Sequence, residues 1–586
     1  MVQWLKRHWL EYVLSAIFTL SAMSLISTQF IYLCDTNDDV LMRSIVSGTY
    51  TGSPDAHLVY IMYPLGCLLK ACYGLSSKIA WYDGFMIGLH YICWFLLAAR
   101  VGSCFQRKKN KVLSIIVTFL LFALIDLPHV VTHQYTILAT WLGVVALFWL
   151  MTDKSSGVKE FILTHIVTIA ALLLCLWLRK QVFFMVLPFM ALILLYRLYK
   201  ERKLKGKKLF FQYAGFLGVL LIVTAVSFVV DKGAYASEEW KDYLAYNEAR
   251  TEIYDYYQAP PYEVFADDYA ELGYSAADYE VIASYNIGLM PDVDADTLQT
   301  FASWSEEYAR WQEQYYSVYR KTLFALCENI LYNSVQPIGV MLLLLYAGCF
   351  VFAYAKNKKE EAVTVVALAL FQCLFVAYFL WRGRFPEHVS YGFYLLQFVF
   401  LCGLFVRDIK ELRDTKKKKE RFWAILVWGM ILVVSLHFGM YQYKTTLDTN
   451  REELAVIEEW ETIKKYCAEH AEQDFFLKLN AVGGYTEAML QNNVVTTDNT
   501  HYLGTWLLNS PLYEERLQNR GISDVGACLA TNTNAAMIQL GYEDTLWLTE
   551  FYQEQGYAGT IEVKDSVLLP SGNSMSVLSM QENSER

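Results

Sequence analysis

The sequence predicts an all-α polytopic membrane bundle of about eleven transmembrane helices, with an extracytoplasmic helical loop and a C-terminal α/β soluble domain. Three observations predict this fold class. The chain of 586 residues is 55% hydrophobic and only 18% charged, which is too apolar for one water-soluble core. Apolar runs of roughly 20 residues, the length that crosses hydrocarbon as a helix, recur along the first three quarters of the chain. Basic residues occupy short loops, whereas acidic residues gather in two long segments.

Eleven apolar segments are expected to cross the bilayer as helices, because only internally hydrogen-bonded segments are stable in hydrocarbon. They are residues 12–33, 79–99, 112–125, 130–151, 161–178, 182–196, 210–230, 338–354, 363–381, 391–406 and 422–440. With the N-terminus in the cytoplasm, the basic clusters at 107–111, 197–208, 356–359 and 416–421 all fall inside. Lys6 and Arg7 precede the first run, which we interpret as a retained signal anchor.

A further apolar stretch, residues 57–74, is predicted not to span the membrane. If it crossed, the basic cluster at 107–111 would lie outside, against the positive-inside rule. Pro64 and Gly66 also lie near its middle. We therefore expect a re-entrant or interfacial helix on the outer leaflet.

The chain is predicted to divide into four parts, two in the membrane and two outside. The membrane modules are 1–230, with an acidic first outer loop at 34–78, and 337–440. The loop 231–336 should be helical at 240–257, 276–285 and 298–326. The tail 441–586 predicts helices at 451–468 and 543–555 and strands at 474–479, 493–496, 559–563 and 574–579. That order indicates a compact extracytoplasmic α/β domain.

The twelve cysteines show no CxxC pair and no Cys/His metal-ligand spacing. Most lie within apolar runs, where packing is their ordinary role. Cys467 and Cys528 lie in the tail, where an oxidising compartment would permit a disulfide between them. The sequence leaves that pairing open.

Three carboxylates follow the first span, at Asp35, Asp38 and Asp39, and Arg43 lies one helical turn beyond Asp39. Such closely spaced acids repel one another unless a cation, a proton or a basic partner is present. One interpretation is a solvated helix end. The other is a catalytic or metal-holding cluster, with Asp38 and Asp39 as the metal ligands.

Basic residues also occur at predicted outer ends, against the trend of the larger clusters. Arg179 and Lys180 lie between the fifth and sixth spans, and Arg382 and Arg384 between the ninth and tenth. A lipid phosphate would account for them, because arginine offers a planar fork and lysine a point charge to its oxygens. General snorkelling to lipid headgroups is the alternative. Further polar residues at the same ends are secondary candidates for substrate binding: Asp55, His57, Asp126, His129, His133, Glu387 and His388.

Acids and cations at one membrane face suit sugar transfer from a lipid phosphate. A carboxylate can take a proton from an acceptor hydroxyl, and fixed cations can stabilise the departing phosphate. A transporter or flippase should carry charges or broken helices near the midplane, and these are scarce here. A non-enzymatic scaffold for polysaccharide assembly is a further alternative.

This layout resembles the C-type superfamily of membrane glycosyltransferases, which use polyprenyl-phosphate sugars. The resemblance rests on the acidic first outer loop, from Asp35 to Arg43 and on through residues 50–57, together with the many spans and the soluble tail. The Tyr-rich loop at 259–292 is similar to uncharacterised bacterial membrane proteins associated with surface polysaccharides. No sequon-recognition signature occurs in the tail, so protein glycosylation is not indicated.

The resemblance implies a role for each group of residues. Asp35, Asp38 or Asp39 would be the base or a metal ligand, and Arg43, Arg179, Lys180, Arg382 and Arg384 would hold the lipid phosphate. The implied partners are a polyprenyl-phosphate-linked sugar, a glycan or lipid acceptor and the bilayer, with no nucleic acid. Whether Mg²⁺ or Mn²⁺ is needed stays open, because carboxylates suit either ion or neither.

The predicted topology can be tested with cysteine labelling in a background whose native cysteines are replaced by serine. A membrane-impermeant maleimide added from outside should label Ser77→Cys and leave Ser103→Cys unlabelled, because 57–74 does not cross. The reverse labelling pattern would restore a twelfth span.

Overall fold

The structure is a computed structural model that describes residues 2–155, 157–314, 337–355, 358–381, 386–414, 418–478, 486–491, 497–541 and 545–582. The chain divides into two compact units. The first comprises Met1–Asp35, Ala56–Asp231 and Tyr319–Asn450, and the second Thr36–Asp55, Lys232–Val318 and Arg451–Arg586. Three segments that are distant in the sequence therefore join in the second unit.

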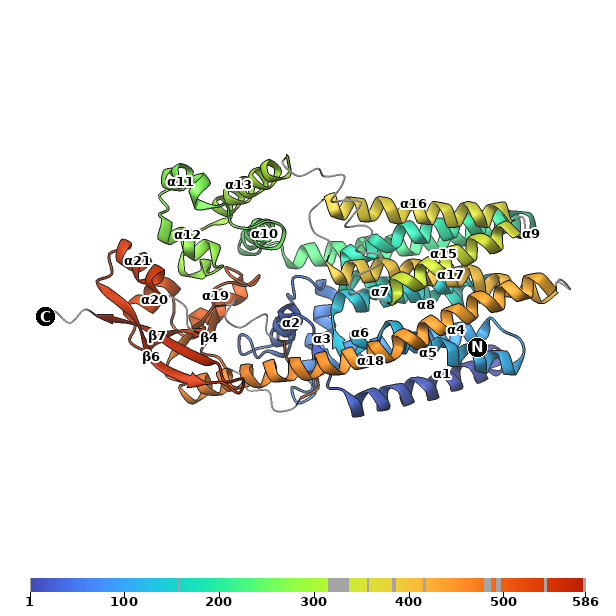
Figure 1. Ribbon diagram of the computed structural model, residues 1–586, viewed down its shortest axis with the longest axis horizontal. Helices are drawn as coiled ribbons and strands as arrows, with labels where there is room; N and C mark the ends of the chain where they lie inside the picture. The colour runs from blue at the N-terminus through green and yellow to red at the C-terminus, as the bar shows by residue number, and fades with distance from the viewer. Residues whose placement is uncertain are drawn as a thin grey trace. The chain divides into compact units, whose positions relative to one another are not determined.

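The first unit is a bundle of helices (Figure 1). Its helices are α1 (Val2–Gln29), α3 (Tyr63–Leu75), α4 (Trp81–Ser103), α5 (Lys108–Ile125), α6 (Leu127–Val131), α7 (Tyr135–Met151), α8 (Val158–Leu178), α9 (Lys180–Ala234), α15 (Ile338–Ala355), α16 (Lys359–Trp381), α17 (Glu387–Asp414) and α18 (Lys418–Glu469). A pair of two-residue strands, β1 (Leu33–Cys34) and β2 (Thr132–His133), lies among them. The last residues of α9 and the part of α18 from Arg451 onward belong to the second unit.

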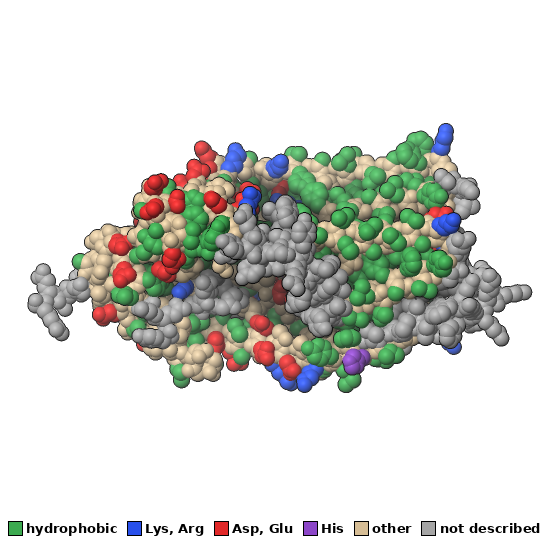
Figure 2. All heavy atoms as spheres, turned by 45° about the horizontal axis from the view of Figure 1, so that its top comes forward, with side chains coloured by type: hydrophobic (Ala, Val, Ile, Leu, Met, Phe, Trp, Pro, Cys, Tyr) green, Lys and Arg blue, Asp and Glu red, His purple; other side chains and the backbone are tan. Residues whose placement is uncertain are grey.

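Among the described residues, six helices are long and apolar enough to cross a membrane. They are Trp9–Gln29, Trp81–Ser103, Val158–Leu178, Lys180–Glu201, Gly206–Ala234 and Lys359–Phe379. Their outward faces carry large apolar side chains such as Leu20, Leu221 and Leu374, and hydrophobic side chains cover the bundle in Figure 2. Lipid is the solvent that stabilises such a surface. The prediction of a mostly helical, multi-pass membrane protein is confirmed.

Two predicted segments, the fourth span and the eleventh, differ in their details from the structure. The stretch at 57–74, predicted not to span, contains α3, whose 13 residues would extend only about 20 Å as a helix, short of the hydrocarbon core. The sixth and seventh spans are the two parts of α9, which meet at a kink where Gly206 has a non-helical backbone. The fourth span does not begin at residue 130, because α6 and β2 precede α7. The eleventh span and the first tail helix form one helix, α18.

Several basic residues of the clusters at 107–111 and 197–208 contact acids. Lys111 contacts Glu11, and Lys200 contacts Glu361. Arg197 is fully buried and donates to the carbonyl oxygens of Leu150 and Asp153. These carbonyls belong to the end of α7 and the residues after it, so Arg197 caps that helix.

The second unit combines helices with a five-stranded sheet. Its helices are α2 (Asn37–Ser47), α10 (Glu238–Thr251), α11 (Tyr262–Glu271), α12 (Ala276–Ala283), α13 (Ala295–Gln314), α19 (Pro511–Asn519), α20 (Val525–Thr531) and α21 (Leu546–Glu554). The strands are β3 (Asp474–Leu477), β4 (Thr500–Tyr502), β5 (Ala535–Leu540), β6 (Gly559–Leu568) and β7 (Ser574–Glu582), in the order β4-β3-β5-β7-β6. β3 pairs in parallel with β4 and β5, and β7 pairs antiparallel with β5 and β6.

The loop after α9 and the C-terminal tail share one hydrophobic core. Ile253, Phe301 and Leu289 from the loop pack in the same cluster as Phe476 and Phe551 from the tail. The backbones also meet, since the Gly288 amide donates to the Leu503 carbonyl at 2.8 Å. A Cβ on Gly504 would stand 1.9 Å from the carbonyl oxygen of Tyr285. The helical loop and the tail are therefore parts of one folded body.

The tail contains elements that the sequence analysis did not predict. β5 reads Ala-Ala-Met-Ile-Gln-Leu and is the central strand, although alanine and glutamine favour strands weakly. Pairing on both edges determines its conformation. The sequence analysis also did not predict β4, α19 and α20. The predicted strand at 493–496 lies outside the described residues.

Candidate active site

Asp35 lies at the end of a short parallel ladder in the first unit. Leu33 pairs with Thr132 and Cys34 with His133, and the Asp35 amide donates to the His133 carbonyl at 2.8 Å. The strands are buried, whereas Asp35 itself is exposed. The ladder therefore presents one carboxylate of the acidic cluster at an accessible position beside the start of α7.

Asp126 is the anchor of the segment that forms this ladder. It is fully buried, and its carboxylate accepts from His90 Nε2 at 2.8 Å, Trp94 Nε1 at 2.7 Å and Trp141 Nε1 at 2.7 Å. The Tyr391 hydroxyl lies 3.1 Å from its Oδ1. Donors from α4, α7 and α17 thus converge on one carboxylate. Asp126, a predicted substrate-binding residue, therefore has both carboxylate oxygens in contact with side chains of the bundle.

Two histidines flank this anchor. The His129 ring packs against Tyr391 with centroids 3.9 Å apart. Burial lowers the pKa of His129 to about 4, against the opposing effect of Asp126. His129 is therefore neutral at pH 7 and can offer a phosphate a hydrogen bond but no charge. His133 is buried, its ring 5.3 Å from that of His90.

Arg179 follows α8 and lies beside two tyrosines. Its guanidinium carbon lies 5.3 Å from the centre of the Tyr60 ring and 5.2 Å from that of the Tyr135 ring, and Nη1 donates to the Tyr135 hydroxyl at 3.0 Å. That is its one hydrogen bond to the described part of the chain, whereas the guanidinium of Arg197 meets two carbonyls and Glu201. Arg179 thus keeps donors available for an anion, and Lys180 beside it is exposed.

A strained loop brings further residues to this place. Val59 has φ 60°, a left-handed conformation that a β-branched residue rarely adopts. Gly66 permits the close approach of α3, because a Cβ there would stand 2.1 Å from the Ala56 carbonyl oxygen. The loop carries Tyr60 and also His57, whose ring lies 4.8 Å from that of Tyr63.

Asp231, near the end of α9, accepts the Tyr63 amide at 2.8 Å and lies within electrostatic reach of Lys180 and His57. Sequence reasoning did not single out Tyr60, Tyr135 or Asp231. Tyrosine is common in this chain, and Asp231 reads as the first acid of a long acidic loop. Only the fold distinguishes these three from their neighbours.

The segment from His133 to Tyr135 connects the acid and the cation. Its backbone binds Asp35 through His133, and its Tyr135 side chain binds Arg179. An exposed carboxylate and a guanidinium are therefore held by residues two positions apart. The structure brings together Asp35, Asp126, His129, His133, His57, Arg179 and Lys180 at one end of the bundle.

The other predicted residues divide between the two units and the residues outside the described ranges. Asp38, Asp39, Arg43 and Asp55 belong to the second unit, where Asp39 is buried and Asp38 half-buried on the first turn of α2. Arg43 contacts Glu487 and donates to the Ala488 carbonyl at 3.1 Å. Glu387 and His388 begin α17. Arg382 and Arg384 lie outside the described residues.

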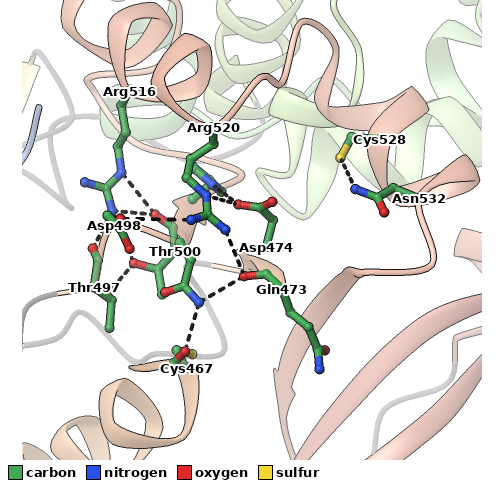
Figure 3. Close-up of polar contacts among 12 residues, drawn as sticks. Cys467, Gln473, Asp474, Thr497, Asp498, Thr500, Arg516, Arg520, Cys528 and Asn532 are labelled. Carbon is green, nitrogen blue, oxygen red and sulfur yellow. Dashed lines mark hydrogen bonds and ion pairs between the residues drawn. The ribbon is translucent and has the colours of Figure 1, made fainter. Parts of the chain in front are cut away.

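A second polar network, in the second unit, holds the edge of the sheet. Figure 3 shows Arg516 and Arg520 pointing from α19 and its end toward Thr500 and Asp474. Asp474 accepts from His501 Nε2 at 3.1 Å and Arg520 Nε at 2.9 Å. Burial raises the pKa of Asp474, but the bonds and charges of His501 and Arg520 outweigh it and lower the pKa. Burial lowers the pKa of His501.

Within the described ranges, no group of three or more His, Cys, Asp or Glu side chains is placed to hold a metal ion. Cys467 and Cys528 are free thiols, the first buried and the second partly exposed.

The chain matches no protein-family model and no curated protein. Among solved structures it is similar to the crystal structure of ArnT from Cupriavidus metallidurans bound to undecaprenyl phosphate. The match covers 96% of this chain and 97% of that chain, with 11% sequence identity and a TM-score of 0.37.

Replacing Asp126 by asparagine should destabilise the bundle. Asparagine keeps one acceptor oxygen but turns an amide group toward indole donors, so at least one buried N–H loses its partner at a cost of about 1–3 kcal/mol. The thermal unfolding temperature of the purified protein in detergent should fall. Asp242→Asn, at an exposed position, is the matched control, and equal unfolding temperatures for the two variants would contradict the anchoring role.

Acidification should destabilise the second unit through His501. Its folded pKa is lowered, so its contribution to stability is present above the unfolded value of about 6.5 and is lost as pH falls toward the folded pKa. Asp474, with its lowered pKa, adds a loss only below about pH 4. Between pH 7 and 5, the unfolding temperature of the wild-type protein should fall more steeply than that of His501→Gln. The difference corresponds to at most about 1.4 kcal/mol in the free energy of unfolding per pH unit. His470→Gln, a partly exposed histidine in the same unit, is the control, and an unchanged slope in His501→Gln would refute the assignment.

Proposed function

We propose that this protein is an integral membrane glycosyltransferase that moves a sugar from a polyprenyl-phosphate donor to a cell-surface glycan or lipid acceptor on the outer face. One observation carries the proposal. Asp35 and Arg179 are both bound to the segment from His133 to Tyr135, the first through a backbone hydrogen bond and the second through a side chain. This pairs an accessible carboxylate with an arginine that has unused donors.

The proposed reaction is a displacement at the anomeric carbon of the donor sugar. A carboxylate of the acidic cluster takes the proton of an acceptor hydroxyl, and the acceptor oxygen forms a bond to the anomeric carbon. The bond from that carbon to the phosphate oxygen breaks, and the lipid phosphate leaves with the electron pair. Asp35 is the carboxylate that the geometry favours, and Asp38 and Asp39 are the other candidates from the sequence.

The cations would act on the leaving phosphate. Arg179 lies beside two tyrosine rings and donates to the Tyr135 hydroxyl, and these contacts would hold its fork in place before the lipid arrives. Fixed donors stabilise charge that develops on a leaving group without reorganising. Lys180 would add a point charge, and Arg382 and Arg384 are the further cations that the sequence assigns to this role. His57, His129, His133, Glu387 and His388 are the further candidates for contacts with the sugar or the phosphate.

The proposal also assigns the helix ends to the two faces of the membrane. An eleven-span bundle with its N-terminus in the cytoplasm puts the ends of α5 and α8 and the starts of α7 and α9 at the outer face, and the acid-paired basic residues at the inner face. The loop after α9 and the tail, including its sheet, would then be extracytoplasmic. A polyprenyl-phosphate donor would place its phosphate at headgroup depth beside Arg179.

The function is tested by transfer of radiolabelled sugar from a panel of undecaprenyl-phosphate hexoses and pentoses, with membranes that contain the full chain. Asp35→Asn should lower transfer at least about 100-fold, the usual size of a lost general base. Arg179→Gln should lower kcat/KM by about 10²–10³, and Arg179→Lys by less. Asp242→Asn and Arg310→Gln, both at exposed positions on helices of the second unit, control for the loss of charge.

A producing strain gives an independent readout of the acidic cluster. Asp38→Asn and Asp39→Asn, tested beside Asp35→Asn, should show which carboxylate the surface glycan requires. Normal glycan and normal transfer in all three variants at normal expression would reject catalysis by this cluster. That result would favour a scaffold or a transporter instead.

A further inference from the structure

The acidic helix α2 depends on contacts from other parts of the chain. It has 11 residues, which is shorter than an isolated helix needs to be stable in water. Its N-cap, Thr36, makes no capping hydrogen bond with its side chain. Its first turn nevertheless carries Asp38 and Asp39, two candidates for the catalytic base. Something outside α2 must therefore fix its position.

The first such contact is an ion pair between α2 and the tail. Arg43 contacts the Glu487 carboxylate and also donates to the Ala488 carbonyl at 3.1 Å. Glu487 accepts further from Lys464 Nζ at 2.9 Å and Trp460 Nε1 at 3.3 Å. Burial raises the pKa of Glu487, but the charges of Arg43 and Lys464 outweigh it and lower the pKa. The ionised carboxylate therefore links α2 to the part of α18 that belongs to the second unit.

The second contact joins the end of the same loop to α19. Arg516 is buried and donates to the Tyr50 carbonyl at 2.6 Å, with its guanidinium 5.0 Å from the centre of the Tyr50 ring. Its other donors bind the carbonyls of Thr497 and Thr500. Asn519 donates to the Thr51 carbonyl at 3.1 Å. All the groups in both contacts belong to the second unit.

The loop between the two contacts is itself tightly turned. Gly48 ends α2 with φ 87°, and a Cβ there would stand 2.6 Å from the Pro54 nitrogen. The chain therefore folds back on itself directly after α2. The contacts of Arg43 hold the middle of α2, and those of Tyr50 and Thr51 hold the loop directly after its C-terminal end.

We propose that the C-terminal tail is a positioning element of the active site, and that Glu487 and Arg516 hold the acidic helix α2 in its reactive orientation. This rests on the proposed function, since it gives a role to the tail in the use of Asp38 and Asp39. Neither Glu487 nor Arg516 touches substrate in this proposal. They act through α2.

The test compares Glu487→Gln with Arg310→Gln in the full chain. Arg310 forms an exposed ion pair with Glu306 on α13 in the same unit, so its loss removes a salt bridge without touching α2. Hydrogen exchange of residues 37–47, followed by mass spectrometry, should become at least tenfold faster in Glu487→Gln and stay at the wild-type rate in Arg310→Gln. In the undecaprenyl-phosphate sugar assay, kcat should fall at least tenfold in Glu487→Gln with little change in the KM for the donor.

A second variant guards against a simple folding defect. Arg43→Gln should reproduce both effects of Glu487→Gln, and Arg43→Lys, which keeps the ion pair, should restore most of the activity. A raised donor KM in Arg43→Gln together with a wild-type kcat in Glu487→Gln would overturn the proposal, because Arg43 would then bind the donor directly. Unchanged exchange of residues 37–47 in Glu487→Gln would overturn it as well.

The outcome is separable from that of the proposed function. If Asp38→Asn or Asp39→Asn abolishes transfer while Glu487→Gln and Arg516→Lys transfer at the wild-type rate, the function stands and the positioning role fails. If Asp35→Asn alone abolishes transfer, α2 is dispensable and the positioning role also fails. If none of the three aspartates is needed, the proposed function itself fails.

Discussion

The candidate site depends on the hydrogen bonds that the buried carboxylate of Asp126 accepts. A charge in a dry helical bundle is costly unless donors surround it, and here an imidazole, two indoles and a phenol do so. These donors come from α4, α7 and α17, so the carboxylate fixes the crossing point of three helices. The segment that follows Asp126 then runs through α6 and β2 in one defined path. That path determines where Asp35 ends its ladder and where Tyr135 meets Arg179.

Three arginines show how differently one side chain is used in this chain. Arg197 and Arg516 are buried and direct most of their donors at backbone carbonyls, so each acts as a cross-link between segments. The Arg179 side chain is only half-buried and donates to a single tyrosine hydroxyl in the described part of the chain, with two tyrosine rings beside it. A guanidinium held in this way is pre-organised but not saturated. That combination suits anion binding better than it suits packing.

The second unit holds a short acidic helix through contacts among its own segments. Its length gives α2 little stability, whereas Glu487 and Arg516 of the tail contact α2 and the loop after it. The loop after α9 stabilises the tail in turn, because both contribute to one core. Three distant segments of the chain therefore depend on one another in this unit.

The sequence by itself determined the helical membrane bundle, because hydrocarbon length and the exclusion of charge leave few alternatives to apolar helices of that size. It also indicated Asp35 and Arg179, since ions at span ends are conspicuous in an apolar chain. Only the tertiary structure decided which donors surround Asp126, that Arg43 pairs with Glu487, and that Tyr60 and Tyr135 contact Arg179. Each of these depends on which donors meet a carboxylate or which rings flank a cation, and such pairings join residues up to hundreds of positions apart. The same holds for β5, whose alanine-rich strand exists because β3 and β7 pair with it on both edges.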